Sequence, residues 1–140
     1  MQENLNKVMN WFENVSPETL PQMRQIYSEP TYFKDPFHEM HSVEKELIPY
    51  FSKMFTGLED ARFEFLKSVL QGSDAFLVWN MKFKVKGRDF QIHGSSHLKF
   101  NEQGLVSYHR DYWDPVEEVY DKIPGVGLLT KGLKKIFKSL

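Results

Sequence analysis

Tyr32-Phe33-Lys34-Asp35-Pro36-Phe37 is the stretch from which the fold of this chain can be worked out. A hydrophobic, strand-like run ends here in a carboxylate and then turns at a proline. Aspartate is a poor strand former, and the proline that follows it holds Asp35 in an extended conformation. A carboxylate between two phenylalanines is a candidate general base for chemistry on an apolar substrate. A solvated turn aspartate is the alternative interpretation.

Helical patterns lie on both sides of this stretch. Apolar residues recur at helical spacing between about residues 3 and 14. Ser16-Pro17-Glu18 has the pattern of a helix start, so a second, short helix is predicted to run to about Tyr27, before Pro30. Ser42 starts a third helix in the same way, and Pro49 inside that helix predicts a kink.

The hydrophobic pattern changes from a helical period to a strand period after Gly57. Residues from about 61 to 71 form one predicted strand, and the alternation from Trp79 to Val85 forms the next. Turns at residues 86–89 and 101–104 separate two further strands, the last of which runs through Trp113. Helices followed by a long antiparallel meander predict an α+β fold, in which a curved sheet wraps over the helices.

Composition limits the functions that this chain can have. Its 140 residues allow one domain, and an aromatic content of 15% indicates a large core or a lined cavity. A formal charge of -1 gives no overall field that would recruit nucleic acid. The lack of cysteine excludes a disulfide framework and thiol chemistry. With no signal-peptide pattern after Met1 and no run long enough to span a bilayer, we expect a cytoplasmic protein.

The predicted order of elements resembles the nuclear transport factor 2-like superfamily over roughly residues 5–115. This group includes ketosteroid isomerases, SnoaL-type polyketide cyclases and limonene-epoxide hydrolases. Asp35 in Phe-Lys-Asp-Pro-Phe matches the carboxylate that shuttles the proton in ketosteroid isomerases. Residues 100–104 and the pair Tyr112-Trp113 match that family's last hairpin and terminal aromatic pair. The resemblance implies a cone-like fold, with N-terminal helices packed in a strongly curved antiparallel sheet that usually keeps a hollow.

The oxyanion hole of ketosteroid isomerases is where this sequence departs from that family. In the same alignment, Trp11 replaces the tyrosine and Ser96 replaces the protonated acid. An indole N–H and a serine hydroxyl are weaker donors to a dienolate, and losing one good donor costs on the order of a hundredfold in rate. We therefore do not expect steroid isomerisation by the known arrangement.

The last strand offers replacement groups. His109 and Asp111 share a strand face with Trp113, which the resemblance turns toward the cavity, and lie roughly 6–7 Å apart along the strand. Together with Asp35 across the pocket, they are candidate catalytic residues for general acid–base proton transfer. A hydrogen-bonded pair that only orders the strand, or an edge that faces water, is the alternative interpretation of His109 and Asp111.

These observations predict a cavity for a small, largely apolar molecule and an isomerase- or cyclase-like enzyme that needs no cofactor or metal. The alternative is a non-catalytic ligand-binding or protein-interaction module of the same fold. Residues 110–114 also resemble a strand of limonene-epoxide hydrolases, but residues 94–97 lack the Arg-x-Asp of that family. Residues 38–41 are interpreted as a solvated loop rather than a metal site. Residues expected to bind the ligand, although each also fits plain core, are Trp11, Tyr27, Phe51, Trp79, Met81, Phe83, Ser96 and Trp113.

The chain divides into a domain at residues 1–122 and a basic amphipathic helix at residues 123–140. The helix carries four lysines and no acid, with an apolar stripe along one side. We expect this stripe to pack on its own domain or on a dimer mate, and contact with an anionic membrane is the alternative. A homodimer is expected through the outer sheet face, which presents His93, His97, Tyr108, Arg110 and Tyr112.

Overall fold

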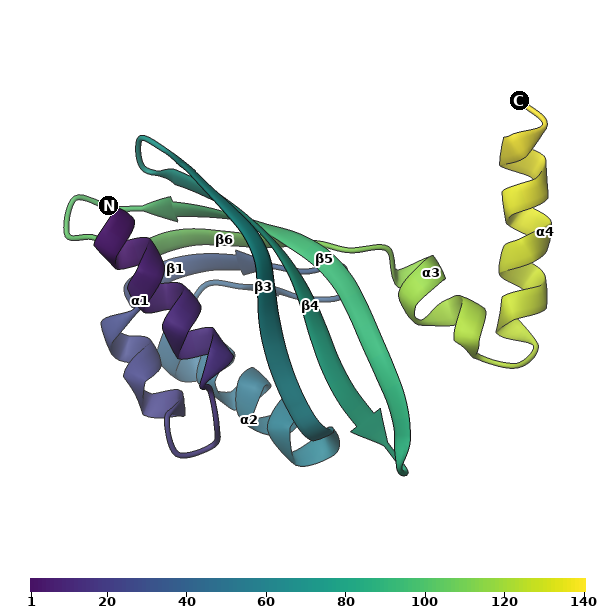
Figure 1. Ribbon diagram of the computed structural model, residues 1–140, viewed down its shortest axis with the longest axis horizontal. Helices are drawn as coiled ribbons and strands as arrows, with labels where there is room; N and C mark the ends of the chain where they lie inside the picture. Colours follow the sequence, from purple (N-terminus) through teal and green to yellow (C-terminus); the bar gives the residue numbers. More distant parts are fainter.

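A six-stranded sheet curves over the N-terminal helices in the computed structural model, which describes residues 1–140 (Figure 1). The strand order is β2-β1-β6-β5-β4-β3. The strands are, in chain order, β1 (Tyr27–Lys34), β2 (Glu39–Met40), β3 (Glu59–Gln71), β4 (Asp74–Val85), β5 (Arg88–Phe100) and β6 (Val106–Tyr112). This architecture confirms the predicted α+β, cone-like class.

One pairing in the sheet differs from the predicted meander. Strands β1 and β6 run parallel, whereas the other neighbours run antiparallel, so the sheet is mixed. A parallel pair needs a long connection between its strands, and here residues 35–105, which include the whole meander, lie between β1 and β6. The β1–β6 ladder is interrupted between Tyr27 and Tyr32, where Pro30 has no backbone N–H to donate.

The predicted hairpins of the meander are confirmed. Strands β4 and β5 pair without interruption from Asp74 opposite Lys99 to Val85 opposite Arg88. Side chains alternate between the two faces of a strand, so Ala75, Leu77, Trp79 and Met81 of β4 face the core, while the residues between them, Phe76 included, face outward. Gly94 of β5 leaves room for a core side chain, since a Cβ there would lie 2.7 Å from the Trp79 ring.

The helices cover the concave side of the sheet (Figure 1). Helix α1 (Gln2–Glu13) confirms the first predicted helix and buries Leu5, Val8, Trp11 and Phe12. The second predicted helix is shorter than expected: Ser16–Thr19 forms a hydrogen-bonded turn, and a 3-10 helix, η1 (Leu20–Gln25), follows it. Pro30 was predicted to follow the end of this helix. It lies within strand β1 instead.

The third predicted helix is confirmed. At the position of the predicted kink, the helix changes from a π-helix to an α-helix. The Ser42 hydroxyl accepts a hydrogen bond from the Lys45 amide at 3.1 Å, as a capping residue does. The first turn is a π-helix, η2 (Val43–Leu47), and the α-helix α2 (Ile48–Gly57) begins just before Pro49. Proline is accepted there because the first turn of a helix leaves its N–H groups without intrahelical partners.

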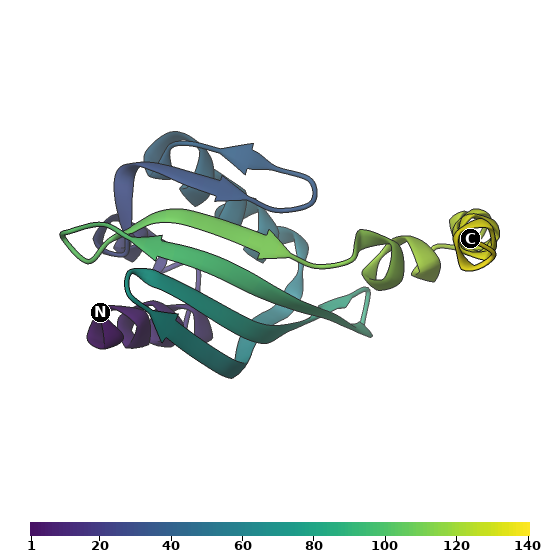
Figure 2. The ribbon, with the colours of Figure 1, turned by 90° about the horizontal axis from the view of Figure 1, so that it is seen from above.

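The C-terminal elements extend away from the sheet, as Figures 1 and 2 both show. They are α3 (Pro115–Glu118), η3 (Tyr120–Lys122) and α4 (Val126–Lys138). The apolar stripe of α4 does not pack on its own domain, one of the two expected positions, since its residues are 38–94% exposed. None of the helices combines the length and the apolar character needed to cross a bilayer.

The outer face of the sheet carries the aromatic side chains on which the dimer prediction depends. Tyr108 stacks on Tyr32, with ring centroids 5.1 Å apart. His97 stacks on Phe76 at 4.6 Å, and its Nε2 lies 2.6 Å from an Asp74 carboxylate oxygen. These contacts order the face within one chain, and a dimer through it stays a prediction.

Candidate functional site

A cavity of about 200 Å³ lies on the concave face of the sheet, between the sheet and helix α2. Its walls are mostly apolar, and Asp35 and Asp111 are the two carboxylates that line it. Both carboxylates therefore reach the same space from different strand ends, β1 and β6. The predicted site residues that line this cavity are Asp35, Phe51, Trp79, Met81, Phe83, Asp111 and Trp113.

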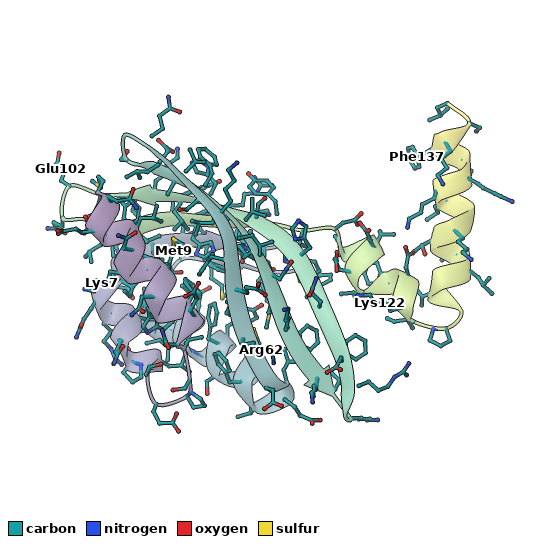
Figure 3. The ribbon with its side chains drawn as sticks, in the orientation of Figure 1. Lys7, Met9, Arg62, Glu102, Lys122 and Phe137 are labelled. Atoms are coloured by element: carbon teal, nitrogen blue, oxygen red, sulfur yellow. The ribbon has the colours of Figure 1, made fainter.

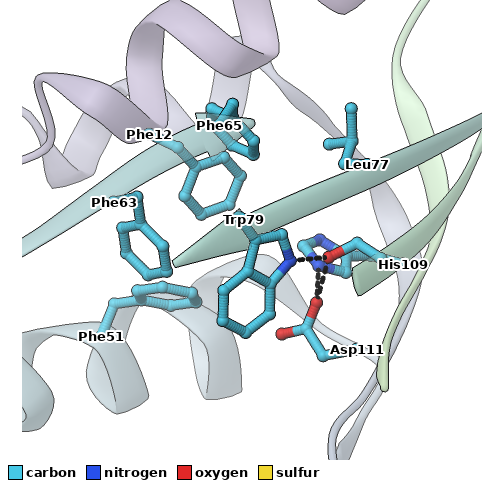
Figure 4. Close-up of a pocket in the computed structure, with 9 residues that line it drawn as sticks. Phe12, Phe51, Phe63, Phe65, Leu77, Trp79, His109 and Asp111 are labelled. Carbon is cyan, nitrogen blue, oxygen red and sulfur yellow. Dashed lines mark hydrogen bonds and ion pairs between the residues drawn. The ribbon is translucent and has the colours of Figure 1, made fainter. Parts of the chain in front are cut away.

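A second, smaller space adjoins this cavity and is shown in Figure 4. Its volume is about 20 Å³, which is enough for one water-sized group. His109 and Ser96 line the smaller space, and Asp111 lines both spaces. The prediction that His109 lines the same cavity as Asp35 and Asp111 is therefore wrong: His109 is 4% exposed and lines only the smaller space.

A chain of hydrogen bonds runs through the buried polar side chains of the site (Figure 4). The Trp79 indole donates to the Ser96 hydroxyl at 2.8 Å, and Ser96 donates to Asp111 Oδ1 at 2.5 Å. His109 Nε2 lies 2.6 Å from the same oxygen, and His109 Nδ1 lies 2.8 Å from the Tyr27 hydroxyl. The β-sheet register explains this meeting, since Ser96 of β5 lies opposite Asp111 of β6.

The network assigns a proton to one nitrogen of His109. A neutral imidazole protonated at Nε2 donates to Asp111 and accepts at Nδ1 from the Tyr27 hydroxyl. Asp111 then receives two donors on Oδ1, while no hydrogen bond from the protein reaches its Oδ2. A carboxylate that is fixed through one oxygen and free at the other is suited to accept a proton from a bound molecule.

Asp35 is held differently from Asp111. Its Oδ1 accepts hydrogen bonds from the Phe37 amide at 2.8 Å and the His38 amide at 2.7 Å, and lies 3.0 Å from His38 Nδ1. Its Oδ2 accepts from the Tyr50 hydroxyl at 3.0 Å. The alternative of a solvated turn residue is only half right, because Asp35 does close the turn but is 6% exposed. Asp35 itself is therefore buried at the edge of the cavity, although Pro36, Phe37 and His38 of its turn are exposed.

Tyr50 is a functional candidate that the sequence analysis missed. It lines the cavity from α2, and its hydroxyl binds Asp35. Burial raises the pKa of Tyr50 well above its usual range, and the charges of Asp35 and Asp111 raise it further. The signal available in the sequence was a tyrosine one helical turn before Met54, on the flank of the predicted buried stripe.

The raised pKa values of Tyr27 and Tyr50 predict that the protein loses stability in alkaline solution. Burial raises the pKa of Tyr27 as well, with a further contribution from the charge of Asp111. The unfolded chain releases these phenol protons near pH 10, whereas the folded chain holds them. The stabilisation is therefore complete below about pH 10 and is lost as the pH rises toward the folded-state pKa values.

Urea unfolding between pH 8 and pH 11.5 measures this loss. We expect the free energy of unfolding to fall above about pH 10, and to fall less steeply in Tyr50→Phe. The comparison is one of slopes, because Tyr50→Phe also loses the hydrogen bond to Asp35 at every pH. If the free energy of unfolding fell equally steeply with pH in both proteins, the raised pKa of Tyr50 would be contradicted.

Trp11 is a predicted ligand-binding residue that lines neither space. Its indole N–H donates to the Thr19 carbonyl at 3.1 Å, which turns the ring toward η1. The next residue of α1, Phe12, lines the smaller space instead. Tyr27 also lines neither space, and it reaches the site only through its hydrogen bond to His109. The structure therefore does not place Trp11, a predicted ligand-binding residue, in the lining of either space.

Residues 38–41 were predicted to form a solvated loop, and they are more ordered than that. Glu39 and Met40 form β2, and Met40 is buried opposite Phe33 of β1. The His38 ring packs on Tyr50 with centroids 4.4 Å apart. No group of three or more His, Asp or Glu side chains in the chain is placed to hold a metal ion.

Comparison with known proteins gives a family match and a set of similar folds. The family model of the SnoaL-like domain matches residues 8–109. No curated protein matches the chain. Among solved structures, an NTF2-like protein of unknown function from Burkholderia pseudomallei is 17% identical with a TM-score of 0.72, over 84% of this chain and 95% of that one.

Two further solved structures carry more specific names. A protein assigned to the SnoaL-like polyketide cyclases, from Shewanella putrefaciens, is 16% identical with a TM-score of 0.72, over 87% of this chain and 96% of that one. An LEH-like epoxide hydrolase from Mycobacterium tuberculosis is 11% identical with a TM-score of 0.69, over 85% of this chain and 81% of that one. At these identities the likeness shows the fold, because one fold hosts many activities.

Proposed function

This chain belongs to the SnoaL-like domain family, within the nuclear transport factor 2-like superfamily, and on that premise we propose that it is an acid–base enzyme. Its substrate is a small, largely apolar molecule held in the cavity of about 200 Å³. The observation that carries this proposal is Asp111, which lines the cavity and whose Oδ1 is fixed by two donors while its Oδ2 has no protein partner. The reaction class is the isomerisation or cyclisation of a carbonyl compound.

We assign Asp111 as the residue that takes a proton from the substrate. Ser96 and His109 are positioning residues, because their hydrogen bonds to Oδ1 hold the carboxylate in one orientation. Tyr50 is the hydroxyl donor that lines the same cavity, and a substrate oxygen that replaced Asp35 as its partner would receive a neutral O–H donor. Asp35 holds Tyr50 in place through its own fully bonded carboxylate.

The second candidate function is a non-catalytic module that binds an apolar molecule. It is favoured by the lack of a free donor at the two positions that form the oxyanion hole in ketosteroid isomerases. Trp11 donates to Thr19, and the Ser96 hydroxyl donates to Asp111. An epoxide hydrolase receives less support, since residues 94–97 (Gly-Ser-Ser-His) contain no Arg-x-Asp.

Hydrogen–deuterium exchange at carbon tests the proposal on a pool of compounds rather than on one chosen substrate. Apolar ketones and 1,3-dicarbonyl compounds are incubated together with the protein in D₂O, and mass spectrometry follows deuterium uptake at the carbon beside the carbonyl group. We expect catalysed exchange in a subset of the compounds, because removal of that proton is the first step of isomerisation and of cyclisation.

The same pool distinguishes the two candidate functions. Ligands retained by the protein are identified by native mass spectrometry, independently of exchange. Retention together with catalysed exchange supports the enzyme. Retention of a compound that carries an exchangeable carbon-bound proton, without faster exchange than in buffer, would establish the binding module and overturn the proposed reaction.

A further inference from the structure

Helix α4 presents an apolar surface that nothing in the chain covers. At 3.6 residues per turn, five of its apolar side chains follow one side of the helix, and Leu140, just beyond its end, continues this stripe. The protruding position of α4 in Figure 3 leaves this side open, with Phe137 labelled near its outer end. The exposed side chains of this stripe are Val126, Leu129, Leu133, Ile136, Phe137 and Leu140.

The opposite side of the same helix is basic. Its four lysines lie about half a turn away from the apolar stripe, and residues 122–140 contain no acidic residue. The lysines account for a charge of +4, which leaves -5 on the remainder of the chain out of a formal total of -1. Positive charge is therefore concentrated on the one element that also exposes an apolar stripe. The lysines are Lys131, Lys134, Lys135 and Lys138.

The orientation of α4 is set by its contacts with η3. Buried Thr130 donates to an oxygen of Asp121, and Lys134 forms an ion pair with the other oxygen. Burial of Thr130 fixes one flank of α4 against η3. The stripe itself stays 38–94% exposed, although Leu133 and Phe137 border an open hollow shared with Val116 of α3. The helix is thus held with its apolar stripe available to another surface.

We propose that α4 docks the protein on the surface of an anionic membrane. A helix with leucine, isoleucine and phenylalanine on one side and lysines on the other lies in the interface, with its apolar side at the level of the acyl chains. Lysine stems reach from that depth to the lipid phosphates. Each lysine near an anionic surface strengthens binding about fivefold, so that four lysines and the stripe act together.

Charge decides between a membrane and a second copy of this chain. Two α4 helices packed through their stripes would leave all eight lysines on the outer sides of the pair, so the contact would use none of the positive charge of α4. Helix pairs that recognise each other place opposite charges beside the apolar seam, and α4 has none to offer. An anionic bilayer supplies both the apolar layer and the negative charge.

Docking through α4 also leaves the cavity end of the molecule beside the membrane. Phe37 lines the cavity and contacts Trp113 at 5.5 Å and Tyr120 at 6.2 Å, which joins the cavity rim to the start of the C-terminal elements. This inference goes beyond the proposed function, since membrane docking does not require Asp111 to be catalytic.

Vesicle sedimentation with the full chain tests the proposal. The vesicles contain phosphatidylcholine alone or phosphatidylcholine with about one-third phosphatidylglycerol, an anionic lipid. We expect the protein to sediment with the anionic vesicles and to be released by high salt, because screening weakens its attraction to them. Lys131→Gln/Lys135→Gln should weaken binding about 25-fold, from about fivefold per lysine. Leu129→Gln/Ile136→Gln should abolish it.

Lys45→Gln/Lys53→Gln is the matched control, since it removes the same charge from exposed lysines near α2. This control should bind anionic vesicles as the unaltered protein does. Equal loss in the control, or no binding of the unaltered protein, would overturn the proposal. So would a dimer in sedimentation velocity that Leu129→Gln/Ile136→Gln dissociates, in a protein that binds no vesicles. Hydrogen–deuterium exchange at carbon, measured without vesicles, tests the proposed function independently of membrane binding.

Discussion

Phe33→Ala is expected to lower the free energy of unfolding by about 3–5 kcal/mol, the usual cost of removing a buried phenylalanine. Phe33 is 1% exposed, and its ring packs at 4.8 Å from His109 and at about 6 Å from Tyr50 and Phe51. Its removal leaves a void where β1, β6 and α2 meet. Urea unfolding followed by circular dichroism measures the change.

Phe37→Ala is the matched control from the same hexapeptide. Phe37 is 50% exposed, so the same deletion removes much less buried surface. We expect a loss of no more than about 1 kcal/mol, in proportion to the area that stays buried. Similar losses in the two variants would contradict the assignment of Phe33 as the core residue that anchors the stretch, and of Phe37 as a residue of the cavity rim.

Asp111→Asn is expected to lower the rate of carbon–deuterium exchange by about 10²–10⁴-fold, the typical contribution of a general base. The amide keeps the shape of the carboxylate, and its Oδ1 still accepts from Ser96 and His109. The group at the cavity then becomes an NH₂, which cannot take a proton. Retained binding of the compound and an unchanged melting temperature would locate the loss in the chemical step.

Asp35→Asn distinguishes the roles of the two carboxylates. The amide oxygen can still accept from the Phe37 and His38 amides, so the turn is preserved. Because both Asp35 oxygens already have protein partners, we expect exchange to fall by less than about tenfold, well below the loss of a general base. A loss as large as that of Asp111→Asn would assign proton transfer to Asp35 instead.

His109→Gln tests the positioning role of the imidazole. Glutamine can donate to Asp111, but its shape does not reproduce the second contact, from His109 Nδ1 to the Tyr27 hydroxyl. The buried Tyr27 hydroxyl then loses its partner, which costs about 1–3 kcal/mol of stability. Exchange activity that survives with a shifted pH profile supports positioning, whereas complete loss would place His109 among the reacting groups.

The local elements of this fold follow from the sequence alone. The alternation from Trp79 to Val85 determines which side chains of β4 face the core, because neighbouring side chains of a strand point to opposite faces. The same parity places His109 and Asp111 on one face of β6, and Ser42 marks the start of a helix through its hydroxyl. These features depend on residues at most four positions apart.

Tertiary structure alone decided which groups of the site are free to react. The parallel pairing of β1 with β6 brings Phe33 beside His109, 76 positions along the chain. The packing of α2 sends the Tyr50 hydroxyl to Asp35, so that only Asp111 keeps an oxygen without a protein partner. Periodicity specifies the face on which a side chain lies, but contacts between distant elements specify its partner, and partners decide whether a carboxylate is bonded or available.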